Sequence, residues 1–236
     1  MARGYPDFSP GAARTAEGEF LPTIAEPPVW YEDNFDSPNL KWLKVSGTVS
    51  LITDSGVAGQ PNIATIGDAL MRIIPAAGGN GRVAKYIGPP LGSKLIGMEW
   101  YFATATDGEF QDREDSIRTQ FYYSDGANAY GVGWSYNPHD YKWYITIDNF
   151  LTTTYITTLQ IINLRRHRVK IIFDIQTHQL RYLIIDGKIF DISAYTFISV
   201  GVATFLNCEL QIRCYDVAGA DAILWIDKVL VTHQES

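Results

Sequence analysis

Cysteine is scarce in this sequence, whose 236 residues include two, Cys208 and Cys214. Both fall in one expected strand, where a rise of about 3.3 Å per residue puts their Cα atoms about 20 Å apart. A disulfide needs Cα atoms within about 7 Å of each other. We therefore predict that no disulfide joins them. A chain of this length buries roughly 70% of the surface of its unfolded state, so it needs neither disulfides nor a structural metal to be stable.

Long apolar runs are absent as well. No segment approaches the roughly 18 consecutive apolar residues of a membrane helix. No apolar stretch of about 7–15 residues follows Met1, as it would in a secretory signal peptide. We therefore expect synthesis in the cytoplasm without a signal peptide, and no insertion into a membrane.

Positive charge is not in excess either. The formal net charge is −7, so the chain lacks the broadly basic surface that displaces counterions from a phosphate backbone. We expect no nucleic-acid partner. The one basic cluster, at residues 165–170, is interpreted as a solvated strand face.

The strongest structural signal is hydrophobic alternation in residues 165–193. Val169 and Ile171 alternate with polar residues, which is the period of a half-buried strand. Asp186-Gly187 stands between two apolar runs and indicates a hairpin, because both turn residues must accept a positive φ. We therefore predict three successive strands that form an antiparallel meander.

Similar strand-like runs, separated by Gly, Pro, Asn and Asp, fill the rest of the chain. Further strands are expected at 43–52, 62–66, 69–75, 82–87, 95–104, 116–123, 129–136, 141–148, 153–161, 197–206, 208–215 and 223–231. Roughly thirteen or fourteen strands with no amphipathic helix predict an all-β fold, a two-sheet antiparallel jelly-roll sandwich.

The 165–193 segment also resembles a known pattern. A basic, His-led strand ends in Asp174, and after a short turn the next strand closes on Asp186-Gly187-Lys188. Laminin-G-like and other concanavalin-A-like domains carry such a segment, and residues 223–231 resemble their closing strand. The resemblance implies a concanavalin-A-like sandwich.

The start of the expected domain resembles the opening of many jelly-roll modules. It has an aromatic and acidic run from Trp30 to Phe35, followed shortly by Trp42. In those modules the first strand pairs with the last, so the resemblance places residues 30–35 beside 223–231. We assign residues 30–236 to the sandwich.

Residues 1–29 differ from the rest because they are rich in proline and show no sustained period. We interpret them as an extended N-terminal arm that docks on a capsid or other assembly protein; the alternative is a disordered tail. Its start, Gly4-Tyr5-Pro6-Asp7, is similar to those of tailed-phage accessory virion proteins. The expected anchors are Tyr5, Phe8, Phe20, Leu21 and Ile24.

Aromatic residues are concentrated between Phe121 and Tyr144. Flat aromatic faces stack on sugar rings and anchor protein interfaces, although core packing would explain the same residues. Gly131 and Gly133 leave one face of their strand thin, which indicates a close backbone approach or a groove. The candidate glycan-binding or partner-binding residues are Tyr130, Trp134, Tyr136, His139, Tyr141 and Trp143.

An acidic loop at 107–115 is the other candidate site. Asp107, Glu109 and Asp112 offer oxygen ligands for calcium. Asp112 and Glu114 alternate like the carboxylate pair of a retaining glucanase, but no third carboxylate follows on that face. The histidines lack a zinc-binding spacing. We therefore assign no catalytic residue and no cofactor, with a calcium ion at this loop as the alternative to a plain solvated surface.

These observations favour a non-catalytic virion accessory protein, of the capsid-decoration or fibre type, that displays a lectin-like sandwich. Such a protein would be exposed on a virion or cell surface and would belong to an oligomer or larger assembly. The first alternative is a carbohydrate-binding module of laminin-G or lectin type that recognises surface glycans. The second is a divergent glycoside hydrolase.

Overall fold

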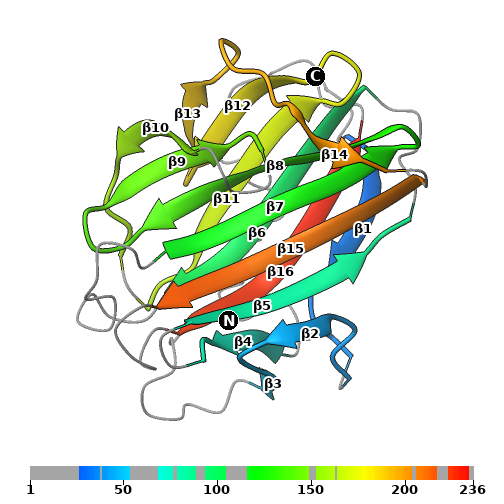
Figure 1. The fold of residues 1–236 in the computed structure, drawn as a ribbon. Helices are drawn as coiled ribbons and strands as arrows, with labels where there is room; N and C mark the ends of the chain where they lie inside the picture. The colour runs from blue at the N-terminus through cyan, green and yellow to red at the C-terminus, as the bar shows by residue number, and fades with distance from the viewer. Residues whose placement is uncertain are drawn as a thin grey trace, which may run out of the picture.

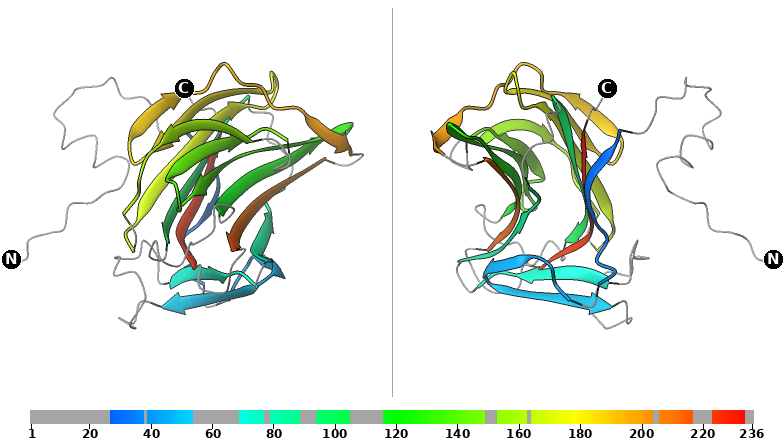
Figure 2. Two further views of the ribbon diagram at one scale, coloured as in Figure 1. Left: turned by 60° about the vertical axis from the view of Figure 1, so that its left-hand side comes forward. Right: turned by 90° about the vertical axis from the view of Figure 1, so that its right-hand side faces the viewer.

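The protein is a sandwich of two antiparallel sheets, each with eight strands (Figure 1). The computed structural model describes residues 27–37, 39–53, 69–76, 79–88, 94–104, 116–148, 153–162, 164–203, 206–216 and 223–233. Within these ranges there is no helix, and so none long and apolar enough to cross a membrane. In side view the sheets form two facing layers (Figure 2).

Sheet A contains both ends of the expected domain. Its strand order is β13 (Lys188–Asp191), β12 (Gln179–Ile185), β11 (His167–Asp174), β6 (Leu95–Thr104), β16 (Leu224–His233), β4 (Ala69–Ile74) and β3 (Thr48–Thr53). The expected meander is confirmed as β11, β12 and β13. The first strand, β1 (Val29–Asp33), pairs with the last, β16, which confirms the expected closure of the jelly roll.

Sheet B forms the second layer. Its strand order is β10 (Thr153–Thr158), β9 (Lys142–Thr146), β8 (Asn128–Asn137), β7 (Ser116–Asp125), β15 (Leu206–Asp216), β5 (Gly79–Tyr86) and β2 (Leu43–Ser46); β14 (Ser199–Val202) pairs with β8. Its longest ladder joins β15 to β7, and long ladders also join β7 to β8 and β15 to β5. Residues far apart in the sequence therefore become neighbours in the middle of this sheet.

The core lies between the sheets and is built from alternate residues of their strands. Phe102 of sheet A contacts Trp134 of sheet B, with ring centroids 5.5 Å apart. Cys208 and Cys214 are both buried thiols, and no disulfide joins them, as predicted. Burial raises the pKa of Cys208 to about 12, because a thiolate is poorly solvated there.

Buried Asp33 explains the aromatic and acidic motif at the start of the domain. Its carboxylate accepts hydrogen bonds from the Phe35 backbone N–H at 3.0 Å, the Trp42 Nε1–H at 3.0 Å and the Tyr31 hydroxyl at 3.1 Å. These bonds fix the turn after β1, where Phe35 adopts a positive φ of 58°. The spacing of Asp33, Phe35 and Trp42 thus reflects one hydrogen-bonded corner.

The expected strand at 43–52 is two strands instead of one. Gly47 separates β2 in sheet B from β3 in sheet A, and its φ is +72°. A Cβ atom at this position would lie 2.5 Å from the Ile74 carbonyl oxygen. The glycine therefore permits the crossing between layers. The strand expected at 62–66 lies outside the described residues.

The hairpin prediction at Asp186-Gly187 is confirmed, since both residues have positive φ, 49° and 85°. Asp186 also accepts a hydrogen bond from the Nδ1 of His167 at 2.6 Å, and the Nε2 of His167 faces the Ile162 carbonyl at 2.7 Å. Interpreting residues 165–170 as a solvated face was wrong for His167 and Lys170, which are buried. Strand β11 lies inside sheet A, where ion pairs and hydrogen bonds hold its polar residues.

Candidate functional site

The outward face of sheet B carries polar side chains along its central strands. On β7, Ile117 and Phe121 are fully buried in the core. Successive strand residues point to opposite faces, so Arg118 and Gln120 point away from the core. The same alternation places the even-numbered core residues of β15 inward and Arg213 outward.

Strand pairing aligns three arginines side by side on this face. Arg213 of β15 lies opposite Arg82 of β5 on one side and opposite Arg118 of β7 on the other. Neighbouring strands are about 4.8 Å apart, so the three arginines span roughly 10 Å. Like charges directly opposite each other destabilise a sheet. We call Arg82, Arg213 and Arg118 the arginine row.

Hydrogen bonds and an ion pair connect the arginine row to Glu209. Arg213 donates from Nη2 to the Gln211 Oε1 at 3.1 Å, and Gln211 donates from Nε2 to the Glu209 Oε1 at 2.6 Å. The Arg82 Nη2 lies 3.9 Å from the same Glu209 oxygen. Burial, together with the charges of Arg82 and Arg118, lowers the pKa of Arg213 to about 10, and Glu209 offsets only part of this.

A second row lies beside the arginines and is uncharged. Gln120 is opposite Gln211 on one side and Gly133 on the other, and Gly133 is opposite Thr146 of β9. The Gln120 side chain is completely buried. Neither its amide oxygen nor its amide nitrogen has a hydrogen-bond partner in the described chain, and the same holds for the Thr146 hydroxyl. Gly133 puts no side chain between them.

Tyrosines border these polar groups. Tyr86 and Tyr122 lie opposite Glu209 on its two sides, and a hydrogen bond to Glu209 raises the pKa of Tyr86. Tyr215 lies under Arg118, whose guanidinium carbon is 5.5 Å from the ring centroid. The two ladder neighbours of Glu209 are thus tyrosines, and neither can act as the second carboxylate of a glycosidase pair.

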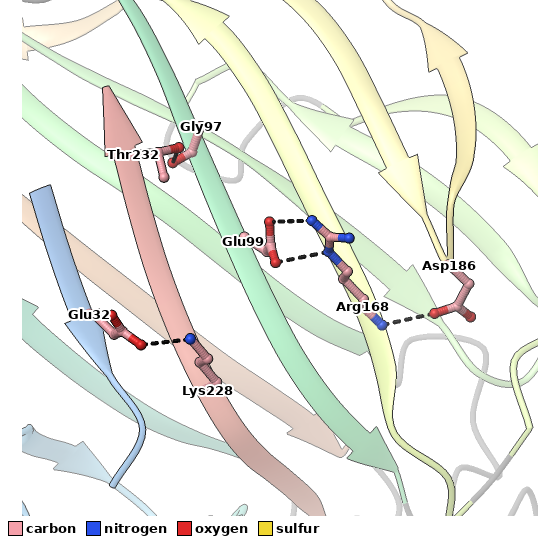
Figure 3. Close-up of polar contacts among 7 residues, drawn as sticks. All are labelled: Glu32, Gly97, Glu99, Arg168, Asp186, Lys228 and Thr232. Carbon is pink, nitrogen blue, oxygen red and sulfur yellow. Dashed lines mark hydrogen bonds and ion pairs between the residues drawn. The ribbon is translucent and has the colours of Figure 1, made fainter. Parts of the chain in front are cut away.

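The outward face of sheet A differs because opposite charges neutralise each other there (Figure 3). Arg168 binds Glu99 through two hydrogen bonds, Nε to Oε1 at 2.8 Å and Nη2 to Oε2 at 2.9 Å. The Lys228 ammonium lies 2.6 Å from Glu32 on β1. These ion pairs satisfy their own polar groups, whereas sheet B carries the buried Gln120 amide without a hydrogen bond in the described chain, so we place the candidate site on sheet B.

The predicted aromatic platform is mostly core. Tyr130, Trp134, Tyr136 and Trp143 are buried between the sheets. Trp143 packs beside Tyr136, with ring centroids 4.5 Å apart and the rings tilted by 32°, and it donates its indole N–H to the Leu159 carbonyl. The prediction that these four side chains bind a glycan was therefore wrong, because they occupy the alternate positions of β8 and β9 that point into the core. The close backbone approach expected at Gly133 is confirmed: a Cβ atom there would lie 1.9 Å from the Thr119 carbonyl oxygen.

The remaining predicted site residues divide into two groups. His139 is exposed in the turn after β8, and Tyr141 follows it, half-buried, with a φ of 59°. The arm anchors Tyr5, Phe8, Phe20, Leu21 and Ile24, and the acidic residues Asp107, Glu109, Asp112 and Glu114, lie outside the described residues. The described part of the chain holds no group of His, Cys, Asp or Glu residues arranged to bind a metal ion.

Sequence reasoning missed the arginine row. Its signal was present in the alternation of Arg118 with Gln120 and of Gln211 with Arg213. What was missing was the strand order, which brings β5, β15 and β7 together although they are far apart in the chain.

The fold is shared with proteins that differ in activity. The structure is similar to a carbohydrate esterase of the Shiga toxin-encoding bacteriophage phi24B, with a TM-score of 0.59, 14% identity, and coverage of 89% of this chain and 100% of the esterase chain. The chain has a concanavalin-A-like jelly-roll fold. The Emp46p carbohydrate recognition domain matches with a TM-score of 0.51 and 9% identity, over 81% of this chain and 88% of that domain.

Peanut lectin also has this fold, with a TM-score of 0.50, 12% identity, and coverage of 78% of this chain and 96% of the lectin chain. No protein-family model and no curated protein matches the sequence. These structures include an enzyme and two carbohydrate-recognition proteins. The shared fold alone therefore does not decide between binding and catalysis.

Proposed function

We propose that this chain is a carbohydrate-binding protein whose ligand lies on the outward face of sheet B, over Gln120 and Gly133. The observation that carries the proposal is the buried Gln120 amide, with neither polar atom hydrogen-bonded in the described chain. Buried polar groups are almost always hydrogen-bonded, and leaving one unsatisfied costs about 1–3 kcal/mol. A sugar hydroxyl both donates and accepts, so it suits an amide that offers both.

The groups around Gln120 support the same proposal. Thr146 adds a buried hydroxyl across Gly133, and Tyr122 and Tyr144 place aromatic rings on the same face of β7 and β9. Carbohydrate sites combine a few convergent polar groups with flat aromatic surfaces. The fold is also one in which carbohydrate recognition occurs, as in the Emp46p domain.

Substitution of Gln120 by methionine tests this proposal. Methionine keeps the length of the side chain and removes only the amide. Because that amide makes no hydrogen bond in the described chain, Gln120→Met should leave the free energy of unfolding unchanged or slightly higher. Binding to a glycan identified on an array should fall about tenfold or more, measured by isothermal titration calorimetry.

Gln179→Met is the matched control. Gln179 lies in sheet A and donates its amide to the Ser193 carbonyl at 2.8 Å. This variant should lose stability and keep full glycan affinity. If Gln120→Met kept full affinity, or if no glycan on the array bound the native protein, the proposed site would be wrong.

We further propose that the protein binds and does not hydrolyse its ligand. Glu209 lies between two tyrosines, which suits a hydrogen-bonding role. The hydrolase alternative rests on Asp112 and Glu114, outside the described residues. Release of reducing sugar that is abolished by Glu114→Gln would establish that alternative.

The proposed setting is a virion, where residues 1–29 attach the sandwich to an assembly protein. The support is the proline-rich sequence of this segment and the likeness of the fold to that of a bacteriophage esterase. Deletion of residues 1–27, which leaves strand β1 and its pairing with β16 in place, should leave cooperative unfolding intact and abolish co-purification with the particle. A truncated protein that stays on the particle, or that fails to fold, would contradict this role.

A further inference from the structure

Three neighbouring strands of sheet A carry another set of buried polar atoms that lack a hydrogen bond in the described chain. They belong to Ser50 of β3, Arg72 of β4 and Trp225 of β16. Ser50 lies opposite Arg72, and Arg72 lies opposite Trp225. The three strands are adjacent in the sheet (Figure 1). These residues therefore form one row across it, which we call the donor row.

Strand alternation places the donor row on the outward face of sheet A. Phe102 packs against Trp134 of sheet B, and Ile226 lies opposite Phe102, so Ile226 also points into the core. The adjacent Trp225 therefore points outward, and so does Arg72 opposite it. Trp225 is 1% exposed and Arg72 is half-buried. The row thus combines a buried indole with a guanidinium that solvent can reach.

The chemistry of these side chains specifies the kind of partner that they lack. The unpartnered atoms are the Arg72 Nε, the Trp225 Nε1 and the Ser50 Oγ. A guanidinium and an indole can only donate hydrogen bonds, whereas a hydroxyl can donate and accept. Two groups that only donate cannot satisfy each other, and buried polar groups almost always have a partner. The missing partner is therefore a hydrogen-bond acceptor.

The positive charge of Arg72 favours an acceptor that is negatively charged. An arginine keeps its proton at ordinary pH. The described ion pairs elsewhere on this face hold Arg168 and Lys228, and Arg72 belongs to none of the ion pairs in the described chain. Hydrogen bonds from a guanidinium to an ionised acceptor are roughly twice as strong as those between neutral groups. An anion therefore suits this row better than a neutral acceptor.

We propose that the donor row binds an oxyanion, a carboxylate, sulfate or phosphate group. The planar fork of Arg72 matches two oxygens of such a group. Trp225 and Ser50 donate from its two sides, because residues directly opposite in a ladder have Cβ atoms only about 4.5–5.5 Å apart. This site lies on the other sheet from Gln120 and is independent of the proposed carbohydrate site.

NMR of the tryptophan indole N–H groups tests the proposal. The protein has six tryptophans, and the signal that Trp225→Phe removes belongs to Trp225. Sodium acetate, sulfate and phosphate are each titrated into the native protein at constant ionic strength, with chloride as the reference salt. At least one of the three should move the Trp225 signal downfield to saturation. The relative affinities for acetate and for the two tetrahedral ions distinguish the sources of the oxyanion.

Two core tryptophans are internal controls for this titration. The indole nitrogens of Trp100 and Trp134 also lack a partner in the described chain, but both rings are fully buried between the sheets. Their signals should stay in place at every concentration of oxyanion. A shift shared by all three indoles would reflect a general effect of the salt and would overturn the proposed site.

Substitutions in the row should weaken the binding measured in this titration. Arg72→Gln removes the charged fork and should lower the affinity roughly tenfold to a hundredfold. Ser50→Ala removes one neutral donor and should lower it about twofold to tenfold. Arg181→Gln is the matched control, because that guanidinium of sheet A already has the Asp174 carboxylate 3.8 Å away. This control should bind as tightly as the native protein.

Thermal unfolding gives a second measurement and shows whether each variant folds. A bound oxyanion should raise the Tm of the native protein more than that of Arg72→Gln, because the general stabilisation by sulfate or phosphate is common to both. If Arg72→Gln does not fold, Ser50→Ala and Arg181→Gln provide the comparison. A Trp225 signal that no oxyanion moves, or equal affinity of the native protein and the folded row variants, would overturn the proposal.

Discussion

Gly133 offers a sharp test of how closely strands β7 and β8 approach at the candidate site. A Cβ atom on Gly133 would lie 1.9 Å from the Thr119 carbonyl oxygen and 2.9 Å from the Gln120 Cα. Cβ atoms essentially never come within 3.0 Å of such a neighbour. In Gly133→Ala the two strands must therefore separate by about an ångström in the middle of sheet B.

The cost of this separation follows from the groups it disturbs. Forcing a methyl group into a packed site costs about 1–3 kcal/mol, and each weakened ladder hydrogen bond adds about 0.5–1.5 kcal/mol. Alanine also lowers the conformational entropy of the unfolded chain, which stabilises the folded state by about 0.4–1 kcal/mol. We expect a net loss of roughly 2–4 kcal/mol in the free energy of unfolding, measured by urea denaturation followed by circular dichroism.

Gly79→Ala is the matched control for this experiment. Gly79 also lies in sheet B, but the nearest atom to its added Cβ would be the Ala76 oxygen at 3.5 Å, an ordinary contact. This variant should be as stable as the native protein or slightly more stable. If the two alanine variants unfolded at the same urea concentration, the close approach at Gly133 would be refuted.

Three further predictions concern stability. Trp225→Ala should cost about 3–5 kcal/mol, because the side chain is 1% exposed and its loss leaves a cavity; a change below about 1 kcal/mol in urea unfolding would place Trp225 at the surface. Asp33→Ala should cost roughly 2–4 kcal/mol, since it leaves buried Trp42 and the Phe35 N–H without an acceptor; an equal cost of Asp33→Ala in the native protein and in a Trp42→Phe background would contradict the coupling of Asp33 to Trp42. Burial disfavours the charged form of His167, but its hydrogen bonds to Asp186 and Ile162 outweigh this and raise its pKa above 6.5. The native protein should therefore exceed His167→Gln in stability by about 1.5–3 kcal/mol below pH 6.5, and the difference should shrink as pH rises through the raised pKa; a difference that grew with pH would show that the ring is neutral.

Much of the fold could be predicted from local sequence. Alternation at Val169 and Ile171 identified β11, and Asp186-Gly187 identified the hairpin after β12, because both signals act between near neighbours. The aromatic opening was interpreted correctly as the strand that pairs with β16. The break at Gly47 was missed, since it depends on the Ile74 carbonyl in another strand.

The candidate site could not be predicted in the same way. For Trp134 and Trp143 the sequence left a binding platform and core packing both open, because alternation shows that residues share a face but not which face is buried; the structure buries both. Arg118 received no role, since a single outward arginine is ordinary. Its importance comes from Arg213 and Arg82, which strand order places beside it.

The sequence by itself determined the all-β fold class, the positions of most strands and turns, and the absence of a disulfide between Cys208 and Cys214. It could do so because periodicity, turn chemistry and chain geometry depend on residues that are close in the sequence. Only the tertiary structure decided which face of each strand is buried and which strands are neighbours. Those two facts depend on how the sheets pack and how distant segments pair. The strand order places Gln120 and the three arginines, which are far apart in the sequence, on one face of sheet B.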